Sequence, residues 1–292
     1  MANREIDNFL LIVGAMKCGT TSLFHYLAKH PQISACKAKE PNFFIKNNLY
    51  EKGFDFYENL WEYNKTKHKF ALEASTSYSK LPHKAHAVER IYEAKAKHKV
   101  NFKFIYIIRN PIDRIISHCT HDLQERWSVK NKQLIVHGIP YRAIEISKYA
   151  MQLEAYYKRF PHEDILLLNF DDLKTRPKEL LNQIYEFTGI DSNFESSSIA
   201  KQHNRSKEKM MTNSLWPKVD KFLVSPIVNY LPPAKRRKTV NTVRKYFETE
   251  KIIQKVELSE LQIDYILQEL KDDLLKLEKE YGVDISKWRL EI

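Results

Sequence analysis

The stretch FLLIVGAMKCGTTSLF (residues 9–24) joins an apolar run to a glycine-containing turn and the start of a helix. Its first part, Phe9–Val13, is entirely apolar and has the length of a strand, which is typical of a strand buried on both faces of a parallel sheet. Thr20–His30 follows as a predicted helix that ends at Pro31. A strand, a tight turn and a helix N-terminus aim backbone N–H groups at an anion, which the helix dipole also favours. The stretch therefore predicts a phosphate-type site within an α/β fold.

The position of the lysine separates this turn from the loops that bind ATP. A loop of the form G-x-x-x-x-G-K-[ST] has its lysine directly after the second glycine, where this chain has Thr20 and places its lysine earlier, at Lys17. Gly14 and Gly19 let the backbone turn tightly and approach a ligand. A plain turn between strand and helix would explain the glycines but not the polar residues around them. The residues that we expect to bind the anion are Lys17, Cys18, Gly19, Thr20, Thr21 and Ser22.

A second cationic position follows the predicted strand NFKFIYIIRN (101–110). This strand ends in Arg109, Asn110 and Pro111, and proline is well tolerated at the start of the helix that we expect next. A kinase or GTPase needs an acidic residue at such a strand end to hold magnesium. A cation suits a second anionic group instead, although Arg109 could also cap the edge of the sheet. The two positions together predict a nucleotide with two separate anionic groups and no metal between them.

Strand patterns and helix patterns alternate along the rest of the chain. The predicted strands are 69–74 and Asp164–Phe170, and the predicted helices are 84–98, 142–160 and Pro177–Thr188. Such alternation predicts βαβ units and a central parallel sheet with helices on both faces. Residues 191–215 are polar and are interpreted as a long loop, and 216–292 as a helical C-terminal extension. Because there is no internal repeat and no evident linker, we expect residues 1–292 to form one domain.

Composition and charge place few limits on function. The chain has 292 residues, 43% of them hydrophobic and 29% charged, and its formal net charge is +11 at pH 7. A basic balance favours anionic partners such as phosphates, acidic substrates, nucleic acid or anionic lipid, without choosing among them. The cysteines form no C-x-x-C pair, so neither a zinc ribbon nor a disulfide framework is indicated. No stretch has the length of a membrane span, and the apolar run at 9–13 is too short for a signal peptide, so we expect a cytoplasmic protein.

Two motifs resemble those of the sulfotransferases that use 3′-phosphoadenosine 5′-phosphosulfate (PAPS). GAMKCGTTSLF (14–24) resembles the family's 5′-phosphosulfate loop, and IYIIRNPIDRIISH (105–118) resembles its 3′-phosphate motif, with Arg109 and Ser117 at the matching places. The two motifs resemble the family's in their order along the chain, in their spacing and in the predicted strands that precede them. The resemblance implies that PAPS is the donor, that 3′-phosphoadenosine 5′-phosphate (PAP) is the product, and that no metal is required. It also places the catalytic Lys17 on the oxygen that bridges sulfur and phosphorus, a task that suits a compact ammonium donor.

Transfer to a hydroxyl or amine also needs a general base. KEPNFF (39–44) resembles the KEP-aromatic segment of heparan-sulfate-type and some bacterial sulfotransferases, in which the glutamate is the base, and this resemblance implies that role for Glu40. We expect Phe43 and Phe44 to desolvate this carboxylate partly and raise its basicity. Asn42 stands where the heparan-type segment often has histidine, which departs from the pattern for polysaccharide contacts.

Two histidines beside the 3′-phosphate motif are alternative bases. His118 and His121 lie one helical turn apart in the predicted helix after Pro111. By their family position they are nearer the nucleotide than the acceptor, so we rank them after Glu40.

Further contacts follow from the resemblance of two other segments. EASTSY (73–78) resembles the family segment after its second strand, where a polar residue often faces the acceptor, and this adds Glu73 to the candidates. The expected acceptor-binding residues are Lys39, Glu40, Ser75 and Tyr78. HNRSKEK (203–209) resembles the family's late loop that closes over the nucleotide. The candidate contacts to the 3′-phosphate in this loop are Asn204, Ser206 and Lys207.

We therefore expect a PAPS-dependent sulfotransferase that acts on a hydroxyl or amine of a small-molecule acceptor, with a polysaccharide as a further possibility. One alternative is a P-loop nucleotide kinase, which the displaced lysine and the missing strand-end acid oppose. Another is a basic protein that binds nucleic acid or a membrane surface, which only the net charge and KRRK (235–238) support. We expect neither a nucleic-acid partner nor an integral membrane segment. The sequence leaves the acceptor, O- versus N-transfer and the oligomeric state open.

Overall fold

A parallel sheet lies at the centre of the protein. The computed structural model describes residues 6–125, 135–194, 210–212, 219–228, 231, 233–251 and 256–291. Within these residues the main sheet has five parallel strands in the order β2-β3-β1-β4-β7. The strands are β1 (Asn8–Gly14), β2 (Ile33–Ala35), β3 (Phe70–Ala74), β4 (Asn101–Ile108) and β7 (Ile165–Asn169). The expected α/β fold with a parallel sheet is confirmed.

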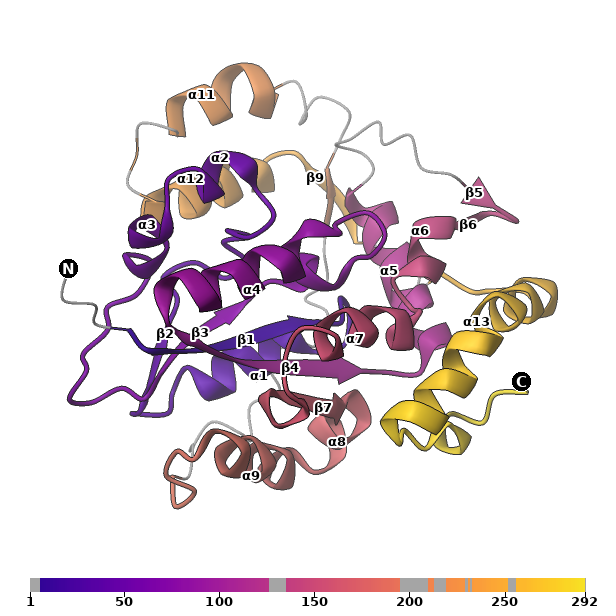
Figure 1. Cartoon of the computed structure of the whole chain (residues 1–292). Coiled ribbons are helices and arrows are strands. Elements are labelled where there is room, and N and C mark those ends of the chain that lie inside the picture. The colour runs from indigo at the N-terminus through magenta and orange to yellow at the C-terminus, as the bar shows by residue number, and fades with distance from the viewer. Residues whose placement is uncertain are drawn as a thin grey trace.

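Helices lie on both faces of this sheet, with α4 on one side and α9 on the other (Figure 1). The longer helices around the sheet are α1 (Thr20–Leu27), α4 (His86–His98), α5 (Pro111–Glu125), α7 (Tyr149–Tyr157), α9 (Pro177–Thr188) and α13 (Glu260–Tyr281). Shorter helical elements connect them: α2 (Asn47–Tyr50), α3 (Phe54–Glu58), η1 (Thr76–Ser79), α6 (Tyr141–Glu145), η2 (His162–Asp164), α8 (Phe170–Thr175) and η4 (Ile285–Trp288). Several ends follow simple rules: α5 and α9 begin with proline, and Gly189 ends α9 at φ 66°.

The core forms because β1 is covered on both faces by apolar side chains. Phe9 is fully buried and stacks on Phe102 of β4 and on Tyr57 of α3, with ring centroids 5.3 Å apart in each case. Aromatic pairs of this kind add to the stabilisation that burial already provides. The uninterrupted apolar run that identified this strand in the sequence thus reflects two covered faces.

The structure corrects the expected elements in three places. The helix expected over 142–160 is two helices, α6 and α7, because the backbone leaves the helical region at Lys148, with φ −74° and ψ 81°. The short edge strand β2 was not expected. The C-terminal part is not purely helical, since β9 (Glu248–Lys251) pairs antiparallel with β8 (Met210–Thr212); a further pair is β5 (Ile135–Val136) with β6 (Ile139–Pro140).

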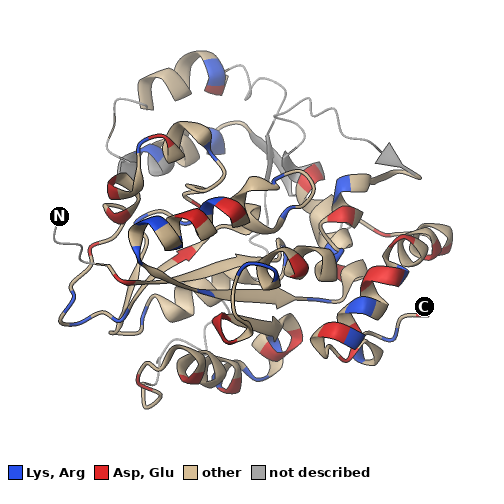
Figure 2. Cartoon of the chain, viewed as in Figure 1, with Lys and Arg blue, Asp and Glu red and all other residues tan. Residues whose placement is uncertain are grey.

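The C-terminal helix α13 is an integral part of the main body. Asp273 of α13 accepts hydrogen bonds from the N–H groups of Ala150 and Met151, at the start of α7, over 2.9 and 2.8 Å. Lys276 pairs with Glu154 one turn further along α7, at 2.9 Å. Acidic and basic residues are interspersed on α13 (Figure 2), and these contacts show that part of its charge holds the two helices together.

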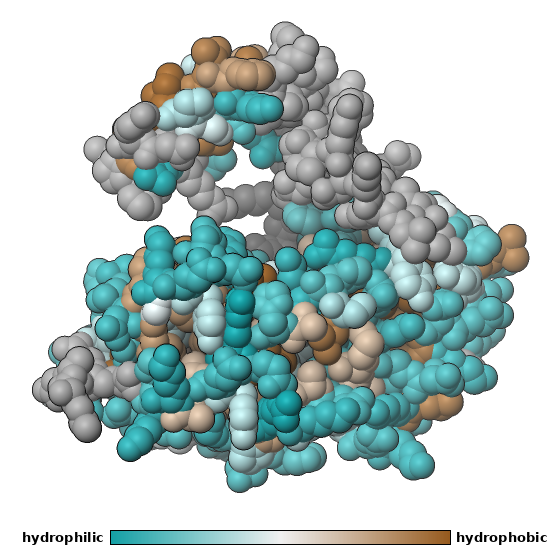
Figure 3. Space-filling model, turned by 45° about the horizontal axis from the view of Figure 1, so that its top comes forward, coloured by the Kyte–Doolittle hydropathy of each residue, from teal (hydrophilic) through white to brown (hydrophobic). Residues whose placement is uncertain are grey.

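A separate small cluster forms between η3 (Asp220–Val224), α11 (Ser225–Val228) and α12 (Pro233–Lys245). Val224 and Val228 pack against side chains of α12 and not against the main core. On the other side of this lobe Phe222 and Ile227 are 68% and 65% exposed, and apolar side chains gather there in the surface view (Figure 3). Among the residues that the structure describes, no helix combines the length and apolar composition that a membrane span requires.

Candidate active site

The two predicted anion-binding motifs meet at the point where the sheet changes direction. From β1 the chain passes to β2 and β3 on one side, and from β4 it passes to β7 on the other. Ligands of open parallel sheets bind at such switch points, beyond the carboxyl ends of the strands. The loop after β1 and the turn after β4 are therefore at the expected position for one shared site.

The loop after β1 has the backbone geometry of an anion site. Lys17 and Gly19 have φ of 73° and 84°, in the left-handed region that glycine tolerates and lysine rarely adopts. No side chain caps the start of α1, and the first N–H groups of a helix have no acceptor within the helix. Thr21 and Ser22 are partly exposed in this first turn, whereas Thr20 is only 5% exposed. Backbone donors and the positive end of the helix dipole thus face the same point as Lys17.

Cys18 and Gly14 have structural roles in this loop. The Cys18 thiol is fully buried and burial raises its pKa to about 11, while its N–H donates to the Ala15 carbonyl at 3.2 Å. Neither group is available to a ligand. Gly14 is needed for packing and not for ligand approach, because a Cβ atom there would lie 2.3 Å from Ser79 Oγ and 2.4 Å from a ring carbon of Tyr106.

Arg109 connects the two motifs. Its Nη1 donates to the Lys17 carbonyl at 3.4 Å, its Nη2 pairs with Asp113 at 3.1 Å, and its guanidinium lies over the Phe170 ring. Its Nε is buried and has no hydrogen-bond partner among the described residues. Ser117 follows Asp113 by four residues in α5, so both are on the helix face that Arg109 approaches. Arg109 is therefore oriented by the loop and by Asp113, an acid that the sequence reasoning did not single out.

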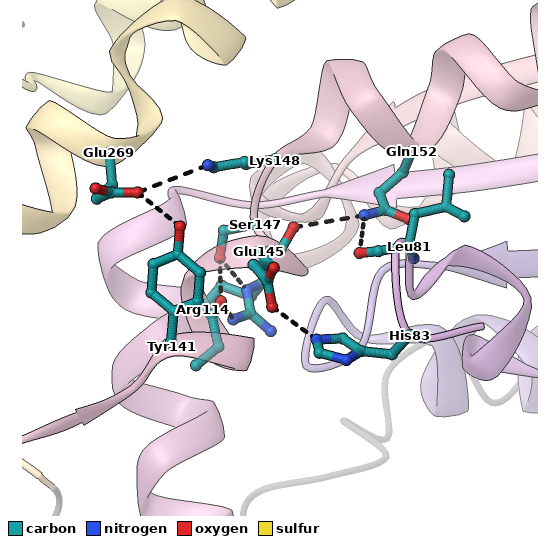
Figure 4. A network of polar contacts seen from close by, with 10 residues as sticks. Leu81, His83, Arg114, Tyr141, Glu145, Ser147, Lys148, Gln152 and Glu269 are labelled. Atoms are coloured by element: carbon teal, nitrogen blue, oxygen red, sulfur yellow. Dashed lines mark hydrogen bonds and ion pairs between the residues drawn. The ribbon is translucent and has the colours of Figure 1, made fainter. Parts of the chain in front are cut away.

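Arg114 is a functional candidate that the sequence reasoning missed. It is fully buried and donates to Ser147 Oγ at 2.7 Å, to the Met16 carbonyl at 3.4 Å and to the Ala143 carbonyl (Figure 4). These acceptors are neutral, and among the described residues no carboxylate pairs with Arg114. Its charge therefore adds a positive potential directly behind the loop. Its signal in the sequence is weak, because it is only an arginine that precedes the buried Ile115 within the 3′-phosphate motif.

Glu40 lies in a strained turn beside the end of β3. Glu40 and Asn42 have φ of 60° and 57° on either side of Pro41, and residues held in such sparsely populated conformations concentrate at functional sites. The Glu40 carboxylate accepts hydrogen bonds from Lys39 Nζ at 2.9 Å and Thr76 Oγ1 at 3.3 Å, and its side chain is 35% exposed.

The apolar cover that we expected for Glu40 is not its environment. Phe43 and Phe44 turn into the core, where Phe43 stacks on Tyr57 at 4.6 Å and Phe44 packs edge-on against Tyr78. The carboxylate itself has polar neighbours and access to solvent.

Ser75 and Tyr78 support the Glu40 turn and do not face an acceptor. Both are 1% exposed. Ser75 Oγ donates to Glu73 at 2.6 Å and accepts from the Asn42 N–H, while the Tyr78 hydroxyl accepts from the Phe44 N–H. Their polar groups are thus engaged within the protein. They link the fully buried Glu73 carboxyl to the 39–44 segment, and burial raises the pKa of that carboxyl.

His118 is a poor base in this environment. It is 4% exposed, and burial together with the charges of Arg114, Lys80 and Arg142 lowers its pKa to about 2. A base is effective when its pKa lies near the working pH, so the proposed alternative role of His118 is not supported. Its Nδ1 lies 3.3 Å from Arg114 Nη1 and its Nε2 lies 3.6 Å from Asp122, which indicates a structural place between two charged groups.

The candidate contacts of the late loop, Asn204, Ser206 and Lys207, lie outside the described residues. Within the described ranges no group of three or more histidine, cysteine, aspartate or glutamate side chains is placed to hold a metal ion.

A parallel sheet with backbone donors after β1 and an oriented arginine after β4 has positions for two anionic groups. The chain belongs to the sulfotransferase domain family, whose model matches residues 7–257. This membership agrees with the resemblance of the two motifs. It decides against the P-loop kinase and against a protein whose role is only to bind nucleic acid or a membrane surface.

Individual relatives agree with the family. The chain is 27% identical over 191 residues to mouse heparan sulfate glucosamine 3-O-sulfotransferase 3B1, covering 62% of this chain and 45% of that protein. It is 28% identical over 188 residues to human heparan sulfate glucosamine 3-O-sulfotransferase 3A1, covering 62% and 44%. The chain thus spans about half the length of the curated relatives it matches. A sulfotransferase from Alicyclobacillus acidocaldarius shares the fold, with a TM-score of 0.63, 19% identity and coverage of 98% of this chain and 99% of that chain.

Proposed function

We propose that this protein transfers a sulfuryl group from PAPS to a hydroxyl or amine of its acceptor. The observation that carries the proposal is the contact between Arg109 Nη1 and the Lys17 carbonyl. It joins the segments that would hold the two ends of an adenosine bisphosphate, at the switch point of the sheet. Family membership supports the same donor.

The residues at this point fit such a donor. Lys17 and the N–H groups at the start of α1 would hold the 5′-phosphosulfate end. Arg109, which has a buried Nε without a partner among the described residues, would hold the 3′-phosphate together with Ser117. The buried charge of Arg114 would strengthen anion binding from behind the loop. When bound, PAPS supplies the sulfuryl group and a phosphate that is a good leaving group.

Two side chains would carry the chemical step. Glu40 would accept the proton of the attacking hydroxyl or amine as the new bond to sulfur forms. Lys17 would donate to the bridging oxygen as the bond between sulfur and that oxygen breaks, which stabilises the charge that develops there. Lys39 and Thr76 hold the Glu40 carboxylate in place, so Lys39 takes part through Glu40 as well as by steering the acceptor.

For the acceptor, the relatives favour a saccharide over the small metabolite that we expected first. The matched proteins are named for transfer to a glucosamine of heparan sulfate. Asn42, which departs from the heparan-type pattern, argues against the same polysaccharide contacts.

The decisive experiment is transfer from radiolabelled PAPS to a panel of saccharides, alcohols, phenols and amines in the presence of EDTA. We expect the wild type to label at least one acceptor and Lys17→Ala to label none. Lys37→Ala is the matched control, because Lys37 has a side chain that is 53% exposed and pairs with Glu62. Transfer that survives Lys17→Ala, or that requires a divalent metal, would contradict the proposal.

A further inference from the structure

Lys80 and Arg142 are two neighbouring cations whose side chains have no acceptor among the described residues. Lys80 follows η1 and is only 8% exposed, and none of the described residues forms a hydrogen bond or ion pair with its ammonium group. Arg142 of α6 has a buried Nε with no partner in the described part of the chain. Buried charges are ordinarily paired, so these two groups call for an anion that the chain itself does not provide.

The charges around Lys80 add up to an excess of positive charge. Those that act on its ammonium come from Arg142 and Arg114, which are cations, and from Glu40 and Asp122, which are acids. Glu40 is already paired with Lys39, and Asp122 lies beside His118. Burial, followed by the charge of Arg142, lowers the pKa of Lys80 to about 8. A bound anion would relieve this repulsion.

The backbone beside each cation is held rigidly. The residue after Lys80, Leu81, exchanges two hydrogen bonds with the Gln152 side chain, at 2.8 and 3.1 Å. The residue after Arg142, Ala143, has a carbonyl that accepts from Arg114 and from Ser147. These contacts belong to one network that spans the segment after η1, together with α5, α6 and α7 (Figure 4). Side chains on fixed backbone can form a preorganised binding site.

A further ion pair closes this network. His83 and Glu145 lie 2.7 Å apart, which links the segment after Lys80 to the end of α6 (Figure 4). The segments that carry Lys80 and Arg142 are thereby tied to each other, so the two cations keep a fixed relation to Glu40.

We propose that Lys80 and Arg142 form an anion subsite beside Glu40, which selects acceptors that carry a carboxylate or sulfate near the reacting hydroxyl or amine. This inference rests on the proposed function, because it assigns the neighbouring Glu40 to the acceptor. The subsite would orient the acceptor through its charge, so the two residues are specificity residues and not part of the bond-breaking step.

The test uses inorganic sulfate as the probe and the PAP-saturated protein, in which the donor phosphate positions are already filled. Sulfate affinity is measured by calorimetry for the wild type, Lys80→Met and Arg142→Gln, at constant ionic strength. We expect each substitution to weaken sulfate binding about tenfold, the loss typical of one charge-assisted hydrogen bond. Lys158→Met is the matched control, because the Lys158 side chain is 68% exposed and should leave sulfate affinity unchanged.

The position of the anion is established in crystals of the PAP complex soaked in selenate, by the anomalous signal of selenium. A selenium peak between Lys80 and Arg142 supports the proposal. A peak only beside Lys17 would assign the anion to the transferred sulfuryl group and overturn the subsite, as would the absence of any peak.

PAP affinity, measured for every variant, separates the possible failures. Unchanged PAP binding by Lys80→Met and Arg142→Gln shows that they are folded, and Arg142→Lys should keep most of the sulfate affinity. If the wild type does not bind PAP, the proposed function itself fails. If it binds PAP but sulfate affinity is the same in all variants, only the subsite fails.

Discussion

Arg109 Nη2 donates to the Asp113 carboxylate at 3.1 Å, and Nη1 of the same guanidinium donates to the Lys17 carbonyl at 3.4 Å. One side chain is thus fixed by an acid of α5 and by the anion loop. Asp113 neutralises part of the charge of Arg109 but also fixes its direction. We expect the direction to matter more, because recognition of phosphate by arginine depends on a planar fork.

Affinity for the donor nucleotide should depend on Arg109. Arg109→Ala should weaken PAP binding about 100-fold, since a charge-assisted contact to a phosphate is lost, and Arg109→Lys should restore only part of it. Calorimetry with PAP gives both values. Arg159→Ala is the control, because Arg159 pairs with Glu89 on the surface. Normal PAP affinity in Arg109→Ala would refute the assignment.

Glu40→Gln should separate binding from turnover. The amide keeps the shape of the side chain but cannot accept the acceptor proton, so we expect a loss of kcat of at least about 100-fold and unchanged PAP affinity. Glu62→Gln, at a side chain that is 86% exposed, should keep full activity. Turnover within a few-fold of the wild type would show that another group is the base.

His118 should remain neutral throughout the range in which histidines usually titrate. Its folded-state pKa of about 2 lies below the ordinary value of 6.5, so protonation favours the unfolded chain. Its contribution to stability is present above pH 6.5 and is lost as the pH falls toward 2. NMR of the His118 ring should show no titration between about pH 5 and pH 8. A midpoint within that range, matched by a limb in the pH–rate profile, would restore His118 as a candidate base.

Glu73 should make the folded state less stable as the pH rises. Burial raises the pKa of this carboxyl above 4.5, so the folded chain holds the proton more tightly than the unfolded chain. The resulting stabilisation is complete below pH 4.5 and is lost as the pH rises through the raised pKa. Glu73→Gln removes this dependence. Urea unfolding of both proteins between about pH 4 and pH 8 should therefore show the wild type losing stability relative to the variant. A constant difference would contradict the prediction.

Gly19→Ala should destabilise the folded state more than Gly189→Ala does. A Cβ atom at Gly19 would lie 2.7 Å from the Phe170 ring at φ 84°, which adds a steric clash to a backbone cost of about 1–2 kcal/mol. Gly189 has φ 66° but open space around its Cβ position, so Gly189→Ala should show the backbone cost alone. The two free energies of unfolding, together with PAP affinity, give the comparison. Equal destabilisation would show that the Phe170 contact is not rigid.

The fold and the donor loop could be predicted because their signals are local. An apolar run of strand length and the residues around Gly19 are read directly from neighbouring positions, as is Arg109 at the end of its strand. β2 was missed since three residues carry too little periodicity. The break between α6 and α7 was missed because residues 142–160 contain no glycine or proline that would mark it.

The acceptor side of the site could be predicted only in part. The motif indicates Glu40, but no local pattern tells whether Ser75 and Tyr78 point outward or into the core. The two side chains point into the core because both form hydrogen bonds with the buried Glu73 carboxyl. Lys80 and Arg142 resemble ordinary surface residues in the sequence, and the burial of Lys80 and of Arg142 Nε becomes evident only in the folded structure.

The contact between the Trp288 carbonyl and Asn110 Nδ2, at 3.1 Å, has a consequence for biosynthesis. Asn110 also starts α5 by accepting from the Ile112 N–H, directly after Arg109. During synthesis on the ribosome, Asn110 is made 178 residues before Trp288, whose carbonyl accepts its hydrogen bond. A nascent chain can therefore complete the surroundings of Arg109 only after α13 and Trp288 have been synthesised, so we expect nucleotide capture to follow the synthesis of this late segment.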